Sequence, residues 1–306
     1  MTRVIVVVGE ALVDLVIQLD TTVSAALGGA PFNTARTCGR LGATVAFMGA
    51  VSNDRFGATI AARLADDRVA TDLLQRVSVP TTLAAAELDA GGAATYRFYT
   101  EATSAPALRP AALPATTETL FAGGLGLVLE PMADAVVGVV AGVGDGVMVM
   151  IDLNCRPAVI DDRDRYVARV DAVVGRADVV KVSDDDLAYL SPGAPPLTAA
   201  RRLLADGPDA VLLTAGGSSV TVLTADDERV VSVTPVDVVD TIGAGDAFAG
   251  GFMSWWDASR RTRGDLVDID VLAAAADAAN RVAGIVCTRR GADPPWRHEM
   301  PADWVA

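Results

Sequence analysis

Short apolar runs alternate with longer segments of helical spacing along most of this chain. The apolar runs are typical of buried parallel strands and cover residues 3–8, 44–49, 127–129, 147–151, 179–182 and 210–213. Apolar residues recur at helical spacing over residues 31–41, 57–66, 198–205 and 271–287. This alternation predicts an α/β fold in which a mostly parallel sheet is sandwiched by helices.

Two segments break the alternation. Residues 12–19 alternate in part between apolar and polar side chains, and residues 82–88 and 95–100 flank the sequence Asp-Ala-Gly-Gly at 89–92, a good hairpin signal. We therefore expect a small antiparallel β lid, from segments at about residues 10–27 and 82–104, inserted in a single domain of residues 1–306. The exposed edges of such a lid favour a homodimer that pairs through it.

Composition narrows the classes of function. The 306 residues carry a formal charge of −14, which argues against nucleic acid or an anionic membrane as a partner, since both require clustered cations. Cys38, Cys155 and Cys287 are odd in number and far apart, so we expect no disulfide framework and a cytoplasmic location. With one histidine, His298, and one lysine, Lys181, a Ser-His-Asp triad, a His-rich zinc site and a Walker-type ATPase are disfavoured.

The run DTIGAGDAFAGG at residues 240–251 carries the most chemistry. Gly243 and Gly245 lack Cβ atoms, so successive N–H groups can converge on one anion where a helix is expected to begin, over residues 246–255. Asp246 at that point could accept a proton from a substrate hydroxyl while the amides hold the transferred charge. This layout is that of a phosphotransferase.

Two other interpretations of this run stay open at the level of residue type. Asp246 could be a plain helix cap. Gly243 and Gly245 also imitate a dinucleotide fingerprint, but that fingerprint needs a following strand that ends in an acid about 20 residues later. Residues 257–265 instead form a polar, arginine-rich stretch, which disfavours dinucleotide binding.

Two stretches together resemble the ribokinase-like (PfkB, phosphofructokinase-B type) carbohydrate kinases. They are GGAPFNTARTCGRLGATVAFMGAVSNDRFG at residues 28–57 and the DTIGAGDAF run. The similarity extends through GEALVDLV near the start, DLNCRP at 152–157, KVSDDDL at 181–187 and VCTRRGADPP near the end. The resemblance implies a ribokinase-like, Rossmann-like α/β fold with a β lid.

The resemblance also implies roles for residues of these motifs. Asp246 corresponds to the base that deprotonates the sugar hydroxyl, and the cradle for the migrating phosphoryl group corresponds to Gly243, Ala244, Gly245 and Asp246. The sugar contacts correspond to Asp14, Gly28, Gly29 and Asn33. By residue type alone, Asp14 could be a solvent-facing strand residue and Asn33 a helix cap.

On the nucleotide side, Thr214 and Gly216 resemble the family's T-x-G-x-x-G loop, in which Ser219 replaces the last glycine. Asn280 resembles a residue near the adenine. The motif that begins at residue 181 adds Lys181 and Ser183 to the residues expected to bind the nucleotide.

Two ion sites are implied in the same way. Asp186 resembles the acid that is linked to Mg²⁺, and because aspartate is one methylene shorter than the family's glutamate, we expect contact through water. Asp240 and the carbonyl of Ile242, with groups near Gly291, resemble the monovalent-cation site that many relatives use, which suggests K⁺.

The sugar is harder to predict. The DLNCRP and SDDD sequences are closer to fructokinases and 2-keto-3-deoxygluconate kinases than to ribokinases or adenosine kinases. Arg156 would suit a substrate or phosphate anion, and Arg97 is a second candidate unless strand alternation sends it to the opposite face of the lid. We expect an ATP-dependent kinase that uses Mg²⁺ and phosphorylates a primary hydroxyl of a monosaccharide, with fructose as the leading substrate. The alternatives are a 2-keto-3-deoxygluconate kinase and a non-catalytic sugar- or nucleotide-binding module, which the intact GAGD sequence disfavours.

Overall fold

The computed structural model describes residues 3–88 and 94–305, and the turn expected at residues 89–92 lies outside them. The α-helices are α1 (Ala30–Leu41), α2 (Arg55–Asp66), α3 (Met132–Gly142), α4 (Arg163–Val174), α5 (Asp184–Leu190), α6 (Pro196–Ala205), α7 (Ala244–Ala258) and α8 (Ile269–Cys287). The strands are β1 (Val4–Val8), β2 (Leu12–Ile17), β3 (Val23–Gly28), β4 (Val45–Ser52), β5 (Val69–Ala70), β6 (Leu74–Val77), β7 (Leu83–Leu88), β8 (Ala94–Tyr99), β9 (Thr117–Gly123), β10 (Met148–Asp152), β11 (Val179–Ser183), β12 (Ala210–Ala215), β13 (Ser219–Leu223) and β14 (Glu228–Ser232). Among these described helices, none is both long enough and apolar enough to cross a membrane.

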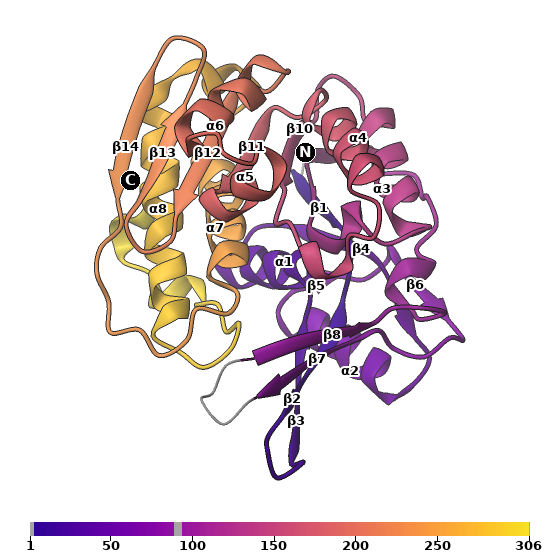
Figure 1. The fold of residues 1–306 in the computed structure, drawn as a ribbon. Helices are drawn as coiled ribbons and strands as arrows, with labels where there is room; N and C mark the ends of the chain where they lie inside the picture. The colour runs from indigo at the N-terminus through magenta and orange to yellow at the C-terminus, as the bar shows by residue number, and fades with distance from the viewer. Residues whose placement is uncertain (1–2, 89–93, 306) are drawn as a thin grey trace.

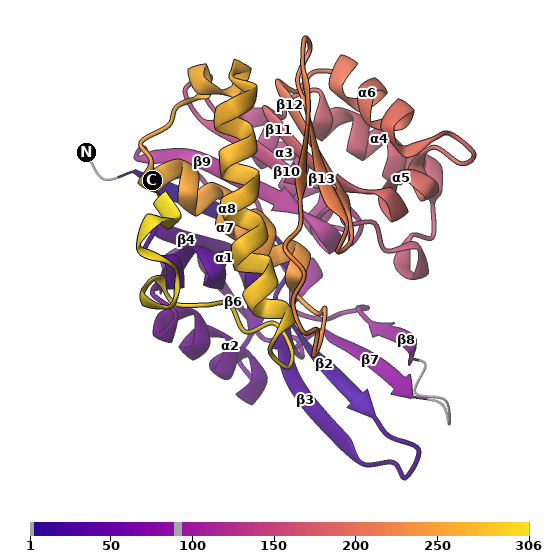
Figure 2. The ribbon, with the colours of Figure 1, turned by 90° about the vertical axis from the view of Figure 1, so that its left-hand side faces the viewer.

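The main sheet has the strand order β14-β13-β12-β11-β10-β9-β1-β4-β5, and β6 also pairs with β4. The pairs from β12 to β5 are parallel, whereas β13 and β14 extend the sheet in antiparallel fashion. Helices cover both faces: α1, α7 and α8 lie on one side and α3 to α6 on the other (Figure 2). This arrangement confirms the predicted helix-covered, mostly parallel sheet.

Strand alternation divides the apolar interior into two cores, one on each face of the sheet. In β1, Ile5 and Val7 pack with side chains of α1, α2, α7 and α8, while Val6 and Val8 pack with those of α3, α4 and α6. All four valine and isoleucine side chains are at most 2% exposed. A strand buried on both faces is apolar at every position, which is why these runs could be recognised in the sequence.

The strands β2, β3, β7 and β8 form a second sheet, which we call the lid, in the order β3-β2-β7-β8. It projects from the main sheet at the bottom of Figures 1 and 2. The predicted pairing of residues 82–88 with 95–100 is confirmed, since β7 and β8 are antiparallel. The central pair β2 and β7 runs parallel, however, so the sheet joins two antiparallel pairs rather than being antiparallel throughout.

One predicted strand is wrong and several strands were not predicted. The apolar residues 127–129 do not form a strand: a 3-10 helix spans Gly124–Leu127, and the strand of this region is β9. Leu125, Leu127 and Leu129 are buried in the core, so the apolar run correctly indicates burial but does not indicate which backbone conformation the segment adopts. β9 was missed because its first residues, Thr117 to Thr119, are polar, and β14 because it is an edge strand with mostly exposed residues. β13, which lies between β12 and β14 and has no exposed residue, was missed as well.

Candidate active site

Helix α7 begins at a glycine that no other residue could replace without strain. Gly243 has φ 78°, and a Cβ atom on it would lie 2.4 Å from Ala292 Cβ. The next N–H, of Ala244, bonds the Thr241 carbonyl at 3.2 Å. Those of Gly245 and Asp246 bond no acceptor in the described residues. Two free amides therefore lie at the positive end of the helix, which is a ready anion site.

Asp246 lies in the first turn of α7 and is 9% exposed. Its Oδ2 accepts a hydrogen bond from Asn33 Nδ2 at 2.9 Å. Burial raises the pKa of Asp246 to about 6, against the lowering effect of the Asn33 hydrogen bond; the nearby charge of Asp152 raises it further. The carboxylate is therefore ionised at neutral pH yet basic enough to accept a proton.

Close packing of α1 on α7 fixes this pair. A Cβ atom on Gly250 would lie 2.6 Å from Thr37 Cβ and 2.9 Å from the Thr34 carbonyl oxygen, so only glycine allows the two helices to approach so closely. Thr34 Oγ1 also donates to the Asp246 carbonyl at 3.3 Å. The helix of the GGAPFN motif and the helix of the GAGD motif are thus in direct contact.

The lid contributes Asp14, which lies against the glycine pair. A Cβ atom on Gly28 would lie 2.0 Å from Asp14 Oδ2, and one on Gly29 would lie 2.7 Å from the Glu10 carbonyl oxygen. Burial raises the pKa of Asp14 to about 6, and the charge of Arg156 acts in the opposite direction. The structure therefore brings Asp14 against Gly28 and Asn33 against Asp246, and Gly29 is the N-cap of the helix that carries Asn33.

Arg156 carries an exposed guanidinium group. Within the described residues it bonds the backbone carbonyls of Asn154 and Cys155 and forms no ion pair. Its charge nevertheless acts on both Asp14 and Asp246. Arg156 thus influences both acids through its charge and has donors left for an anionic group.

Arg97 is not brought to this cluster. The strand register pairs Asp14 with Ala84 and Ala84 with Phe98, so Phe98 shares the face of the lid on which Asp14 lies. Arg97 points to the other face and pairs with Glu87 at 2.9 Å. Phe98 was not among the predicted residues, although counting alternate residues from a fixed register would have placed it on the same face as Asp14.

Thr214, Gly216 and Asn280 lie toward the β14 edge of the main sheet, whereas Lys181 and Ser183 lie on β11. Thr214 lies near the end of β12, and Ser219 begins β13. In the turn between these strands, Gly216 has φ 51° and open space around the position of a Cβ atom. Asn280 lies on α8, is 8% exposed, and its Nδ2 has no hydrogen-bond partner in the described residues. Residues 236–242, before α7, expose four large apolar side chains: Val236, Val238, Val239 and Ile242.

The two acids expected to serve ions are both bound to backbone amides. Asp186 accepts from Cys155 N at 2.6 Å and, in a capping box, from Ser183 N at 2.9 Å. Asp240 accepts from Ile242 N at 3.0 Å and from Gly291 N at 2.9 Å, which joins the two loops of the expected cation site. No cluster of three or more acidic, His or Cys ligands occurs in residues 3–88 and 94–305. A divalent ion here would need ligands from water and substrate.

Two buried acids near Asp246 were not predicted. Both carboxylate oxygens of Glu10 accept backbone N–H groups, from Ala30 at 3.2 Å and Gly126 at 3.1 Å, and burial raises the pKa of Glu10 to about 8. Asp152 pairs with Lys181 at 2.8 Å. Both follow or end parallel strands, β1 and β10, and the carboxyl ends of parallel strands are where sites form, so this rule could have found them.

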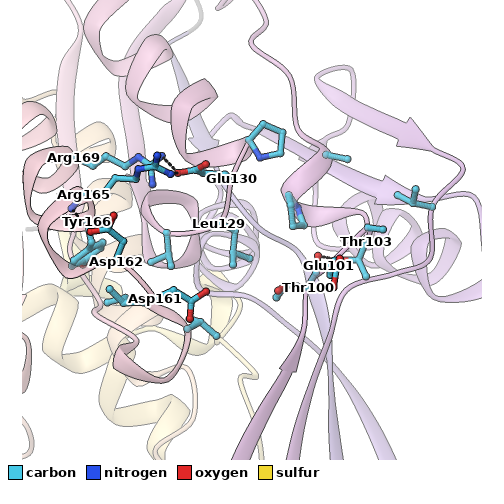
Figure 3. A pocket seen from close by; sticks show the side chains of 18 of the residues that line it. Thr100, Glu101, Thr103, Leu129, Glu130, Asp161, Asp162, Arg165, Tyr166 and Arg169 are labelled. Carbon is cyan, nitrogen blue, oxygen red and sulfur yellow. Dashed lines mark hydrogen bonds and ion pairs between the residues drawn. The ribbon is translucent and has the colours of Figure 1, made fainter.

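A hollow of about 640 Å³ lies beside the base of the lid, away from these residues. Figure 3 shows Thr100 and Thr103 on one wall and Leu129, Glu130 and the α4 side chains on the other. Its α4 arginines, Arg165 and Arg169, already pair with Glu130. None of the predicted site residues lines this hollow.

Comparison with known proteins identifies the family. A family model described as pfkB family carbohydrate kinase matches residues 2–299. A fructokinase of Rhizobium leguminosarum bv. trifolii is 32% identical over 254 residues, which are 80% of this chain and 77% of that protein. The crystal structure of a Xylella fastidiosa fructokinase with bound ATP has a TM-score of 0.89 and 26% identity, covering 98% of this chain and 96% of that one. A Vibrio cholerae O395 fructokinase double mutant, in a form with bound fructose, ADP and potassium ion, has a TM-score of 0.83 and 26% identity, covering 95% and 94%. This chain belongs to the pfkB family of carbohydrate kinases.

Proposed function

We propose that this protein is an ATP-dependent fructokinase, which transfers the γ-phosphoryl group to a primary hydroxyl of fructose. The observation that carries the proposal is the juxtaposition at the start of α7: an Asp246 carboxylate of raised pKa beside two amides without acceptors. Asp246 takes the proton of the sugar hydroxyl, whose oxygen then attacks the γ-phosphorus. The Gly245 and Asp246 amides bind the charge of the migrating group. ADP leaves.

On the sugar side, Asp14, Asn33 and the glycine pair hold hydroxyl groups, and Phe98 closes the apolar face of the sugar from the lid. Asn33 Oδ1 is buried and has no partner among the described residues, so it can accept a sugar hydroxyl while Nδ2 stays on Asp246. Fructose is the named substrate in relatives of similar sequence and structure. The guanidinium of Arg156 bonds two backbone carbonyls but forms no ion pair among the described residues, and this favours the alternative, a sugar acid such as 2-keto-3-deoxygluconate.

On the nucleotide side, adenine packs on the exposed valines of residues 236–239 and bonds Asn280, and the phosphates run past Thr214 and Ser183 toward α7. The orphaned Asn280 Nδ2 supports this placement, because a buried amide without a partner is costly. The buried acids Asp152, Asp186 and Asp246 outnumber the buried cation Lys181, so a Mg²⁺ ion that arrives with ATP fits the site. Bound there, Mg²⁺ would neutralise phosphate charge, and Asp186 would hold it through water. A K⁺ ion would be held by Asp240 and the Ile242 carbonyl.

We also propose a homodimer that pairs through the lid and a cytoplasmic location. Val23 on β3, Tyr96 and Tyr99 on β8, and Leu19 in the connection between β2 and β3 are all more than half exposed, so the lid region offers apolar side chains that a second copy could cover. The three cysteines are free, and Cys38 and Cys155 are buried, which suits a reducing compartment.

The test is ADP release from ATP and Mg²⁺ with a panel of ketoses, aldoses, sugar acids and nucleosides. We expect the highest kcat/KM with fructose. A higher value with 2-keto-3-deoxygluconate would move the assignment to the sugar acid, and sugar binding without turnover on any member would favour a non-catalytic module.

Asp246→Asn tests the base. We expect kcat to fall by about 10²–10⁴-fold with the affinity for ATP retained, because the carboxamide keeps the shape and loses the proton acceptor. Asp178→Asn is the matched control, since Asp178 is also buried but bonds Val149 N and Arg263. That variant is expected to lose stability and keep kcat; equal kcat losses in the two variants would contradict the assignment.

A further inference from the structure

Lys181 is the single lysine in the sequence, and it is buried beside the first turn of α7. The residue is 5% exposed, and its Nζ donates a hydrogen bond to Asp152 Oδ2 at 2.8 Å. Lysines are almost never fully buried unless they are paired, because an ammonium group is costly to remove from water. The burial of a charged lysine beside the start of α7 is therefore costly and suggests a role at this place.

The ammonium group shares its space with the free amides of α7. A Cβ atom on Gly245 would lie 3.4 Å from Lys181 Nζ and 4.0 Å from Cε. An ammonium has three N–H donors, and within the described residues Asp152 takes the one that is bonded. Two donors are left for a group bound next to the Gly245 amide.

Asp152, like Lys181, has hydrogen-bonding capacity that no described residue uses. Its Oδ1 is buried and has no hydrogen-bond partner in the described part of the chain. Burial acts to lower the pKa of Lys181, but the carboxylates of Asp152, Asp186 and Asp246 outweigh it and raise that pKa, so the ammonium stays charged at neutral pH. A fixed positive charge is thus held at the point where phosphoryl charge is expected.

We propose that Lys181 is a further catalytic residue whose ammonium hydrogen-bonds the γ-phosphoryl oxygens during transfer, and that Asp152 is the residue that positions it. This inference rests on the proposed kinase function. The proton of the sugar hydroxyl passes to Asp246, the hydroxyl oxygen forms the new P–O bond, and the bond from phosphorus to ADP breaks. Lys181 keeps its protons throughout. A compact ammonium suits this narrow space better than the planar fork of an arginine.

The kinetic test separates this role from simple neutralisation of Asp152. Lys181→Met keeps most of the side-chain volume and removes the charge, and we expect kcat to fall about 10²–10³-fold with a smaller change in KM for ATP and fructose. That variant also leaves Asp152 unpaired, so the comparison that decides is made in the Asp152→Asn background. There, adding Lys181→Met should lower kcat about 10²-fold again.

Equal kcat values for Asp152→Asn and Asp152→Asn/Lys181→Met would overturn the proposal, because Lys181 would then do no more than neutralise the charge of Asp152. Urea unfolding of all three variants shows whether each one folds. We expect the double variant to be at least as stable as Lys181→Met alone, since it no longer contains an unpaired buried carboxylate.

A second measurement needs no turnover. Lysine labelled with carbon-13 at Cε gives a single side-chain resonance, because the sequence contains one lysine. We expect the non-hydrolysable analogue AMP-PNP with Mg²⁺ to shift this resonance well beyond the shift caused by ADP with Mg²⁺, since only the analogue carries a γ-phosphoryl group. The same shift with both nucleotides would overturn the proposal. A wild-type protein that passes this test but phosphorylates no sugar would refute the proposed function alone.

Discussion

Removing the hydrogen bond from Asn33 should shift the pH profile of the enzyme in a direction that the structure fixes. Asn33 Nδ2 donates to Asp246 Oδ2 at 2.9 Å, and this bond favours the ionised carboxylate. The Asn33→Leu variant removes the donor while it fills a similar volume in α1. Without the donor, the pKa of Asp246 must rise above about 6, and a base that has to be ionised becomes active only at higher pH.

The size of the shift follows from the strength of such bonds. A hydrogen bond to a charged group contributes about 1.5–3 kcal/mol. Since one pKa unit corresponds to about 1.4 kcal/mol, the pKa should rise by about one to two units. At the pH where half of the wild-type Asp246 carboxylates are ionised, about a tenth or less of those in the variant are ionised. Relative to its own high-pH plateau, the variant should therefore be at least about fivefold less active than the wild type at this pH.

The assay is kcat/KM for fructose as a function of pH, with each profile scaled to its own high-pH plateau so that lost sugar contacts do not enter. Asn280→Leu is the matched control: it makes the same substitution on α8, where Asn280 does not contact Asp246, and it should leave the acid midpoint unmoved while KM for ATP rises. If the Asn33→Leu midpoint coincides with that of the wild type, Asp246 does not titrate as the base and the mechanism is refuted.

Three further predictions test other features. Gly245→Ala should stabilise α7 by about 0.5–1 kcal/mol and abolish most activity, since the methyl group enters the space beside Lys181 Nζ. Gly243→Ala should instead lower the free energy of unfolding by about 1–3 kcal/mol, because its Cβ would lie 2.4 Å from that of Ala292. Urea unfolding and kcat, measured together, distinguish the two effects. The pKa of Glu10 is raised from 4.5 to about 8, so between these pH values the folded state binds more protons than the unfolded state. The free energy of unfolding should therefore fall as pH rises through this range, and it should fall less steeply in Glu10→Gln. Equal slopes for the two proteins would show that Glu10 titrates normally. Val23→Lys on the lid should convert a dimer to a monomer in sedimentation, while Val267→Lys, 75% exposed in the wild type and away from the lid, should not.

Much of the fold was predictable because its signals are local. The buried strands β1, β4, β10, β11 and β12 are mostly apolar, with polar residues such as Asp152 and Lys181 near their carboxyl ends. The N-cap of α7 is Gly243, whose left-handed backbone conformation could be expected from the sequence GAGD. The strand predicted at 127–129 failed for the converse reason: those leucines are buried in the core around a 3-10 helix, and burial does not distinguish one backbone form from another. The edge strand β14 is largely exposed and polar, so no pattern marked it.

Site residues could be predicted where each lies in a recognisable motif, but a contact that depends on the register of neighbouring strands could not. The motif residues Asn33 and Asp246 do meet. Whether Arg97 or Phe98 faces Asp14 depends on the register of three strands, which a single strand's pattern does not contain. The pairing of Asp152 with Lys181 likewise arises because β10 and β11 are neighbours in register, a fact of the sheet and not of either segment.

The contact between Thr37 and Gly250 has a consequence for how the enzyme would respond to movements of the lid. Because α1 and α7 are closely packed at this point, Asp246 and the Asn33 amide that lowers its pKa are held by one pair of packed helices. Asp14 and Phe98 lie on a separate sheet. Substitutions that loosen the lid should therefore alter how tightly a sugar is captured and leave the ionisation of the catalytic carboxylate untouched. Substrate choice can then diversify on one part of the molecule without retuning the chemistry on the other.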